Sequence, residues 1–176
     1  MGSLISEKVN IKLNEILTQC FFGNRVCDRA MSYLDVALVM PKTASILHDK
    51  LAHLFPKLGD VVSDFQGSRN GLSDYGETPA DISTYVSAQD FFVKILEFVE
   101  DLESLCYDSR DIAQEERDYA SLTFIDDFIE DISIVTKQCL LLVDKGEAYA
   151  GDWMKFDHDI YDFIILPDFE NGEWVD

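Results

Sequence analysis

The sequence has few of the features that mark a membrane or secreted protein. No apolar run approaches the roughly 20 residues that a transmembrane helix requires, and the opening, MGSLISEKVN, lacks the basic start and apolar core of a signal peptide. The four cysteines, Cys20, Cys27, Cys106 and Cys139, show no CxxC spacing and lie in helical patterns. We therefore expect no membrane association, and we expect buried free thiols in a reducing, cytoplasmic compartment.

Basic residues are also scarce. The 176 residues include 14 Lys and Arg against 34 Asp and Glu, which gives a formal net charge of −20. Such a surface repels phosphate backbones, so we expect no direct binding of nucleic acid. The excess of carboxylates instead favours cations or a basic protein partner. Two enzyme motifs are missing as well, because the sequence has neither GxSxG nor a glycine-rich phosphate-binding loop before a helix.

What the sequence does contain predicts long helices. Up to residue 40, apolar side chains recur at steps of three and four, the period of an amphipathic helix. These positions are Ile5, Val9, Leu13, Ile16, Cys20, Cys27, Met31, Leu34 and Leu38. Pro41 should end this helix near Met40. A second stripe covers residues 44–65, where Pro56 predicts a kink or a break. The short connection between the two predicts antiparallel packing in a bundle.

A loop is predicted where glycines and turn-forming residues gather, in QGSRNGLSDYGETP at residues 66–79. The loop is long enough to cross the bundle and make the second and third helices parallel, although a loop between antiparallel neighbours would have the same composition. Thr78, Pro79 and Asp81 predict the cap and first turn of the third helix. DSRD at residues 108–111 predicts a cap for the fourth helix, which should end at Gly146.

These patterns predict an all-α fold, a four-helix bundle of long helices with a short fifth helix near the C-terminus. The bundle should occupy residues 1–146. Residues 147–176 should form the fifth helix, ended by Pro167, and a loosely attached acidic tail within the same domain.

Three strings resemble the ferritin-like superfamily, nearest its Dps-like branch. VNIKLNEIL at 9–17 resembles the opening of the first helix, and ASILHDKLAHLF at 44–55 resembles the opening of the Dps second helix. DYASLTFIDDFIED at 118–131 resembles the fourth helix. The resemblance implies a homo-oligomeric cage that acts in iron handling or stress protection. It also implies that Fe(II) binds at carboxylates and His, is oxidised in a ferroxidase-type reaction, and is deposited as mineral.

Most of the family's metal ligands are missing, however. Ferritins use an inward Glu on the first helix and an ExxH motif on the second, and neither pattern occurs here. Dps sites use a His in the first helix, which is absent, and carboxylates four apart in the second. Asp60 and Asp64 have that spacing but lie opposite the apolar stripe. Only His48 matches a Dps ligand position, so the site is expected to be degenerate or divergent.

Four residues remain as candidate metal ligands. Asp131 falls on the apolar face of the fourth helix, with Asp127 one turn earlier, and a buried carboxylate needs a partner or a metal. His48 and Glu103 lie at the edges of apolar faces and could face the same core. Carboxylates with one imidazole suit iron or manganese better than zinc.

Two alternatives stay open. Asp131 could instead pair with Lys, Arg or a backbone donor, or face a subunit interface. The whole chain could be a non-enzymatic interaction protein, whose charge of −20 mimics a nucleic acid or binds a basic partner. A ferritin-like subunit that builds a shell without chemistry is a third reading.

Overall fold

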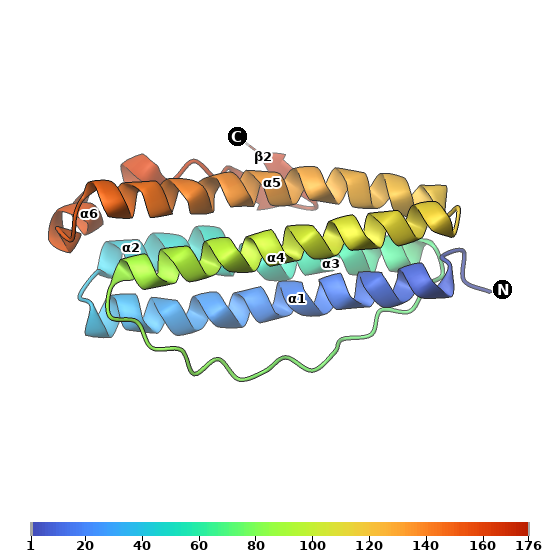
Figure 1. Ribbon diagram of the computed structural model, residues 1–176, viewed down its shortest axis with the longest axis horizontal. Helices are drawn as coiled ribbons and strands as arrows, with labels where there is room; N and C mark the ends of the chain where they lie inside the picture. The colour runs from blue at the N-terminus through green and yellow to red at the C-terminus, as the bar shows by residue number, and fades with distance from the viewer. Residues whose placement is uncertain (1, 176) are drawn as a thin grey trace.

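The computed structural model describes residues 2–175, which form a bundle of four long helical rods (Figure 1). The rods are α1 (Glu7–Ser32) with a π-helical turn (Tyr33–Ala37), α2 (Pro41–Leu47) continued through a second π-helical turn (His48–Ala52) into α3 (Leu54–Ser68), α4 (Ala88–Glu115), and α5 (Tyr119–Ala148). The predicted all-α bundle of long helices is confirmed. Among the described residues, no helix is both long and apolar enough to cross a membrane.

The apolar stripes of the rods meet in one continuous core. α1 packs against α3 on one side and α4 on the other, and α4 packs along α5. Leu13, Ile16 and Leu34, which the helical period places on the inner line of the first rod, are all buried. The spacing of apolar residues in the sequence therefore predicts correctly which face of this rod is buried.

The second rod breaks where proline requires it. Pro56 lies in the first turn of α3, where its missing N–H costs little. The carbonyl of Ala52, which an ordinary residue at position 56 would have bonded, accepts a hydrogen bond of 2.9 Å from the side chain of Asn24. The expected break is confirmed, and α1 supplies the replacement donor.

The connection between α3 and α4 spans the whole bundle. Residues 70–87, here called the crossover strap, run along α1, so that α3 and α4 point the same way (Figure 1). Five α1 side chains hold the strap by hydrogen bonds to its backbone. Asn10 donates to the carbonyl of Leu72 (2.9 Å), Asn14 accepts from the N–H of Asp74 (3.0 Å), Thr18 accepts from that of Gly76 (3.0 Å), Arg25 donates to the carbonyls of Thr78 and Pro79 (3.4 and 3.3 Å), and Arg29 donates to that of Ser83 (3.1 Å). The crossing is thus fixed by polar side chains on one face of α1.

The predicted caps of the last two rods are wrong. α4 begins at Ala88, not near Pro79, because the Asp90 carboxylate accepts from the backbone N–H of Ser87 at 2.9 Å in a capping box. DSRD lies inside α4. The N-cap of α5 is Asp118, whose side chain accepts from the N–H of Ser121 at 3.2 Å. Gly146 also lies within α5, which continues to Ala148.

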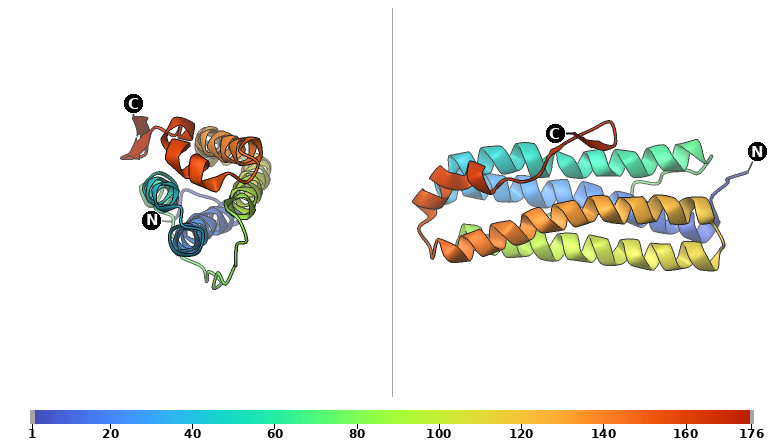
Figure 2. Two further views of the ribbon diagram at one scale, coloured as in Figure 1. Left: turned by 90° about the vertical axis from the view of Figure 1, so that its left-hand side faces the viewer. Right: turned by 90° about the horizontal axis from the view of Figure 1, so that it is seen from above.

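The C-terminal segment folds back onto the bundle. α6 (Trp153–Asp159) and a 3₁₀ turn (Ile160–Phe163) lead to a hairpin of β1 (Asp168–Glu170) and β2 (Glu173–Val175). The hairpin lies over the side of the bundle that α3 and α5 form (Figure 2). The short fifth helix is confirmed, but the loosely attached tail is wrong, because Leu166 and Phe169 are buried.

Candidate functional site

Four-helix bundles build metal sites in their interior from carboxylates and imidazoles that project inward. Over residues 2–175 the interior of this bundle is mostly apolar. Its buried polar or charged residues are Thr43, Gln66, Ser109, Ser121, Gln138 and Asp157. Asp157, the one carboxylate among them, lies on α6 outside the four rods and accepts a 2.7 Å hydrogen bond from the N–H of Thr43. The residues present therefore do not fit a carboxylate-bridged iron centre inside the bundle.

Aromatic rings occupy the space between the rods. Gly23 of α1 faces Phe55 and Phe98, whose rings contact each other edge to face with centroids 5.5 Å apart. A Cβ atom on Gly23 would lie 2.7 Å from a ring carbon of Phe55 and 2.8 Å from one of Phe98. The rings approach the backbone of α1 so closely that the helix has room for glycine only. Side-chain packing, not ligands, fills this part of the core.

The four cysteines are free and buried, as expected from the sequence. Burial raises the pKa of Cys139 to about 12. Burial, with a smaller contribution from Glu103, raises the pKa of Cys106 to about 12 as well. The thiol, not the thiolate, is thus the form of these side chains at neutral pH, and thiols are poor nucleophiles and poor metal ligands.

The candidate ligand His48 lies on the surface, exposed, in the second π-helical turn. Its Nε2 atom is 3.6 Å from a carboxylate oxygen of Asp28 on α1. The π-helical spacing brings the ring of His53 against it, with ring centroids 4.3 Å apart. His48 therefore faces solvent rather than the bundle interior.

The candidate ligand Glu103 links two rods instead of lining a cavity. It is partly buried on α4, where its carboxylate accepts hydrogen bonds from the hydroxyl of Thr136 at 3.3 Å and from Ser133 at 3.5 Å, both on α5. Asp127 is exposed on α5. No three His, Cys, Asp or Glu within residues 2–175 are placed to hold a metal ion, so the structure does not gather the four candidates into one site.

Asp131 has a partner that the helical period alone does not identify. The indole Nε1–H of Trp174, in β2, donates to a carboxylate oxygen of Asp131 at 2.9 Å. Burial raises the pKa of Asp131, and the nearby carboxylates of Asp127 and Glu130 raise it further, while the bond from Trp174 opposes the shift. The contact joins the C-terminal hairpin to α5. Asp131 therefore has a protein hydrogen-bond donor as its partner, which favours a structural role over metal binding.

The substitution Asp131→Asn should be neutral or mildly stabilising at pH 7. The amide keeps an oxygen that accepts from Trp174 and removes a charge that the site disfavours. Because the pKa of Asp131 is raised, its ionisation costs stability at pH values above that raised pKa, and the cost vanishes below the ordinary value of about 3.8. Melting temperatures of the two proteins should therefore converge near pH 3.

Thermal melts at pH 3 and pH 7, with chelator and with added Fe(II) or Mn(II), check this prediction. Trp174→Phe serves as the control, because it removes the donor and keeps an aromatic ring. A metal-dependent rise in the melting temperature of the parent that Asp131→Asn abolishes would instead identify Asp131 as a metal ligand.

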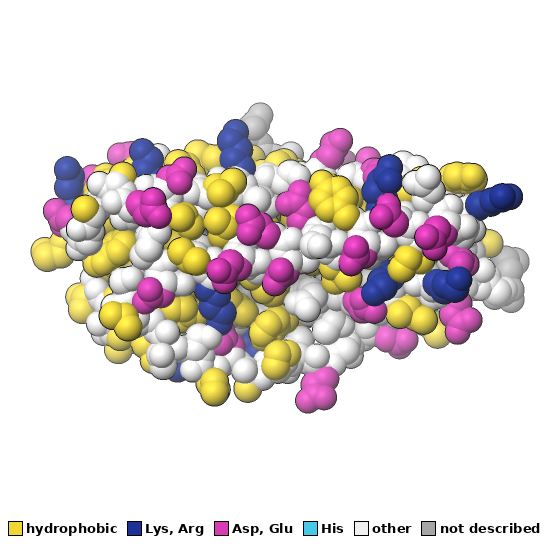
Figure 3. Space-filling model, in the orientation of Figure 1, with side chains coloured by type: hydrophobic (Ala, Val, Ile, Leu, Met, Phe, Trp, Pro, Cys, Tyr) yellow, Lys and Arg dark blue, Asp and Glu magenta, His cyan; other side chains and the backbone are white. Residues whose placement is uncertain are grey.

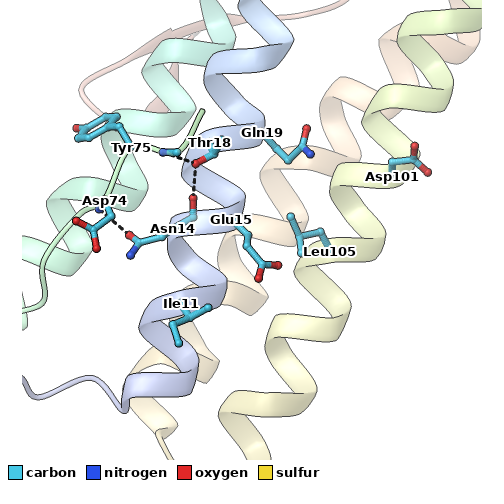
Figure 4. A pocket seen from close by; sticks show the side chains of 10 residues that line it. Ile11, Asn14, Glu15, Thr18, Gln19, Asp74, Tyr75, Asp101 and Leu105 are labelled. Atoms are coloured by element: carbon cyan, nitrogen blue, oxygen red, sulfur yellow. Dashed lines mark hydrogen bonds between the residues drawn. The ribbon is translucent and has the colours of Figure 1, made fainter. Parts of the chain in front are cut away.

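A groove of about 630 Å³ opens between α1, α4 and the crossover strap (Figure 4). We call it the strap groove, and its lining residues are Ile11, Asn14, Glu15, Thr18, Gln19, Asp74, Tyr75, Gly76, Asp101 and Leu105. Figure 4 shows Glu15 and Leu105 between the two helices, with Asp74 and Tyr75 on the strap side of α1. Apolar side chains and carboxylates therefore line one opening, a combination suited to a cationic ligand with an apolar part.

Solved structures share this architecture, although no protein-family model matches the sequence and no curated protein sequence is significantly similar to it. An open-pore ferritin from the archaeon Archaeoglobus fulgidus superposes with a TM-score of 0.83 at 17% identity, over 89% of this chain and 96% of that one. A humanised archaeal ferritin gives 0.83 at 17% identity, over 92% and 98% of the two chains. A PmFTN variant soaked in iron gives 0.80 at 20% identity, over 87% and 99%.

These likenesses establish the fold as a ferritin-like four-helix bundle with a short C-terminal helix. The predicted ferritin-like class is thereby confirmed at the level of the fold. At identities of 20% or less they carry no residue roles from those proteins to this chain.

The residues that position the C-terminal segment and the strap were not predicted from the sequence. Trp174 gave no local signal, because its partner lies 43 residues away. Gln138 falls on the apolar face of α5 two turns after Asp131, which marks it as a polar residue in the core, but its partners lie 25 to 28 residues away and have no local pattern. Asn14 and Thr18 did leave a signal. They lie four residues apart beside the apolar line of α1, so both side chains project from one helix face toward whatever packs there.

Proposed function

We propose that the protein is a ferritin-fold subunit that associates with copies of itself and handles iron as cargo, without an oxidation centre inside each bundle. One combination of observations carries the proposal. The fold is that of ferritins, yet the described interior holds aromatic rings and protonated thiols where bundle metal sites place carboxylates. Iron would therefore bind at the surface or between subunits.

The surface supplies ligands of the right kind for such cargo. Carboxylate oxygens are hard ligands that suit iron and manganese, and the chain carries 34 Asp and Glu. Carboxylates are spread over the face formed by α4 and the strap, with apolar side chains between them (Figure 3). Because the net charge is −20, the local concentration of cations around the protein is raised.

The finer placement near the Dps-like branch, and a role in stress protection, rest on the string around His48. His48 lies 3.6 Å from Asp28 and against the ring of His53 on this surface, but the three are not placed to hold a metal ion by themselves, so iron there would need further ligands from a neighbouring subunit. A cytoplasmic location is supported by the four free cysteines, which a reducing compartment would preserve.

Self-association is supported by aliphatic side chains at one end of the bundle. Val36 and Val39 follow α1, and Ile82 and Val86 belong to the strap; each is between 74% and 92% exposed. The rings of Tyr33 and Tyr85 contact each other there and bring the two segments together. Exposed apolar residues that gather on one surface mark an interaction site, and a second copy would remove them from water.

Light scattering on the purified protein, followed by elemental analysis of the same peak, tests both parts of the proposal. We expect a particle several times the 20.0 kDa mass of one chain, with iron retained after loading. Ile82→Glu combined with Val86→Glu should shift the particle to smaller species, whereas Met154→Glu, on an equally exposed side chain of α6, should not. A monomer that retains no iron would contradict the proposal.

A further inference from the structure

We propose that the strap groove binds a basic amphipathic helix of a partner protein. The proposal goes beyond the iron role and does not depend on it. It rests on three properties of the groove: its length along two helices, its exposed apolar floor, and the carboxylates of Asp74 and Asp101, which have no partner among residues 2–175.

The groove is long enough to contact about two turns of a partner helix. Its α1 residues, from Ile11 to Gln19, are spaced by three and four and cover two turns, about 12 Å at 1.5 Å per residue. Asp101 and Leu105 line the facing turn of α4. A channel between two helices accepts a third helix that presents side chains at positions i, i+3 or i+4, and i+7.

The floor of the groove is apolar and uncovered. Ile11 is 52% exposed and Tyr75 is 60% exposed, and Leu105 between the two helices is only partly buried. Tyr75 is fixed in place, because its ring packs edge to face on Phe21 with centroids 5.4 Å apart. An apolar helix face would cover these side chains and remove them from water.

The polar groups that remain for a ligand are the amide of Gln19 and three carboxylates, so the charged ones are all negative. Asn14 and Thr18 are already engaged in holding the strap. Within the part of the chain that the structure describes, the carboxylates of Asp74 and Asp101 make no hydrogen bond or ion pair, and Glu15 pairs only with Lys12 of its own helix at 2.6 Å. Lysine or arginine beside the apolar face of the occupant would neutralise these charges.

A second copy of this chain is the weaker occupant. It would bring another formal charge of −20 to a rim of carboxylates. The nearby cations are already engaged, because Arg25 and Arg29 bond strap carbonyls and Lys94 pairs with Asp81 at 3.1 Å. Copies of the chain therefore repel each other at this groove, which stays open in the proposed homo-oligomer.

The test uses a fluorescein-labelled amphipathic peptide of leucine and lysine, with fluorescence anisotropy as the readout. A scrambled peptide of the same composition and a leucine–glutamate analogue are the comparison probes. We expect the amphipathic basic peptide to bind more tightly than the scrambled one, and the acidic analogue not to bind. Equal binding of the scrambled peptide would overturn the proposal, because the charge alone would then explain it.

Matched variants locate the site. Asp74→Asn with Asp101→Asn should weaken peptide binding on the order of tenfold, since the two substitutions remove two charge contacts with the peptide. Asp60→Asn with Asp64→Asn removes the same charge from α3, across the bundle, and should change the affinity by less than about twofold. Ile11→Ser should weaken binding, and Leu140→Ser, at a similarly exposed position on α5, should not.

If the two charge variants lose peptide affinity equally, the peptide responds only to the net charge of the protein, and this result would overturn the proposal. If Asp74→Asn with Asp101→Asn changes the particle size in light scattering, a second copy occupies the groove, which also overturns the proposal. Failure of self-association or of iron loading would leave the peptide result unaffected, so the two proposals fail separately.

Discussion

Replacing Gln138 with leucine is expected to release the C-terminal segment from the bundle. The buried amide of Gln138 donates to the carbonyl of Phe163 at 2.9 Å and accepts from the N–H groups of Ile165 and Leu166 at 2.7 and 3.1 Å. Leucine fills a similar volume but leaves all three backbone groups without a partner. Each unpartnered buried group costs about 1–3 kcal/mol, so undocking of the segment becomes the cheaper outcome.

Limited proteolysis with mass spectrometry measures the release, with cleavage expected between Phe163 and Trp174. Fluorescence of Trp174 should shift toward the solvated value at the same time. Lys137→Leu, at the exposed neighbouring position on α5, is the matched control and should leave the digestion pattern unchanged. A Gln138→Leu protein that resists cleavage as well as the parent does would show that other contacts hold the segment.

Truncation of Leu34 to alanine is expected to lower the free energy of unfolding by about 2–5 kcal/mol. Leu34 is 1% exposed in the π-helical turn that ends the first rod, so its removal leaves a cavity in the core. Leu140→Ala, at a position 45% exposed on α5, should cost much less. Urea denaturation gives both values, and equal midpoints for Leu34→Ala and the parent would show that the assigned core face is wrong.

The helical rods could be predicted because their signal is local. A buried stripe such as Leu13, Ile16 and Leu34 repeats with the period of the helix, and Pro41 and Pro56 mark where the backbone can no longer continue. The likeness to ferritins likewise follows from the lengths and order of the rods, which the sequence pattern carries.

Helix ends were harder to place because several residues offered competing caps. Thr78, Pro79 and Asp81 have the composition of a helix start, but Arg25 takes the carbonyls of the first two, and Asp81 bonds Ser83 and Lys94. The capping box of Ser87 and Asp90 then begins α4 later. The sequence around Pro79 and around Ala88 is equally suited to a helix start, and the hydrogen bonds from α1 to the strap exclude the earlier one.

The candidate site could not be predicted, because its parts are distant in sequence. Asp131 was identified as an acid in need of a partner, and it has one, but no helical pattern could identify Trp174 as the donor. The strap groove combines α1, the strap and α4, so its carboxylates and apolar floor become one surface only after folding. The sequence pattern places the four proposed metal ligands on or beside the apolar faces of three helices, yet His48 faces solvent and Glu103 binds hydroxyls of α5.

Oxidation of Fe(II) in air, measured by stopped flow on the light-scattering peak, tests most directly whether this ferritin fold lacks an oxidation centre inside each bundle. Two Fe(II) per chain should be oxidised at the slow rate seen in buffer of the same pH, without a rapid phase, because the described interior offers aromatic rings and thiols in place of carboxylates and imidazoles. A rapid phase whose amplitude corresponds to a fixed number of iron ions per chain would contradict this account.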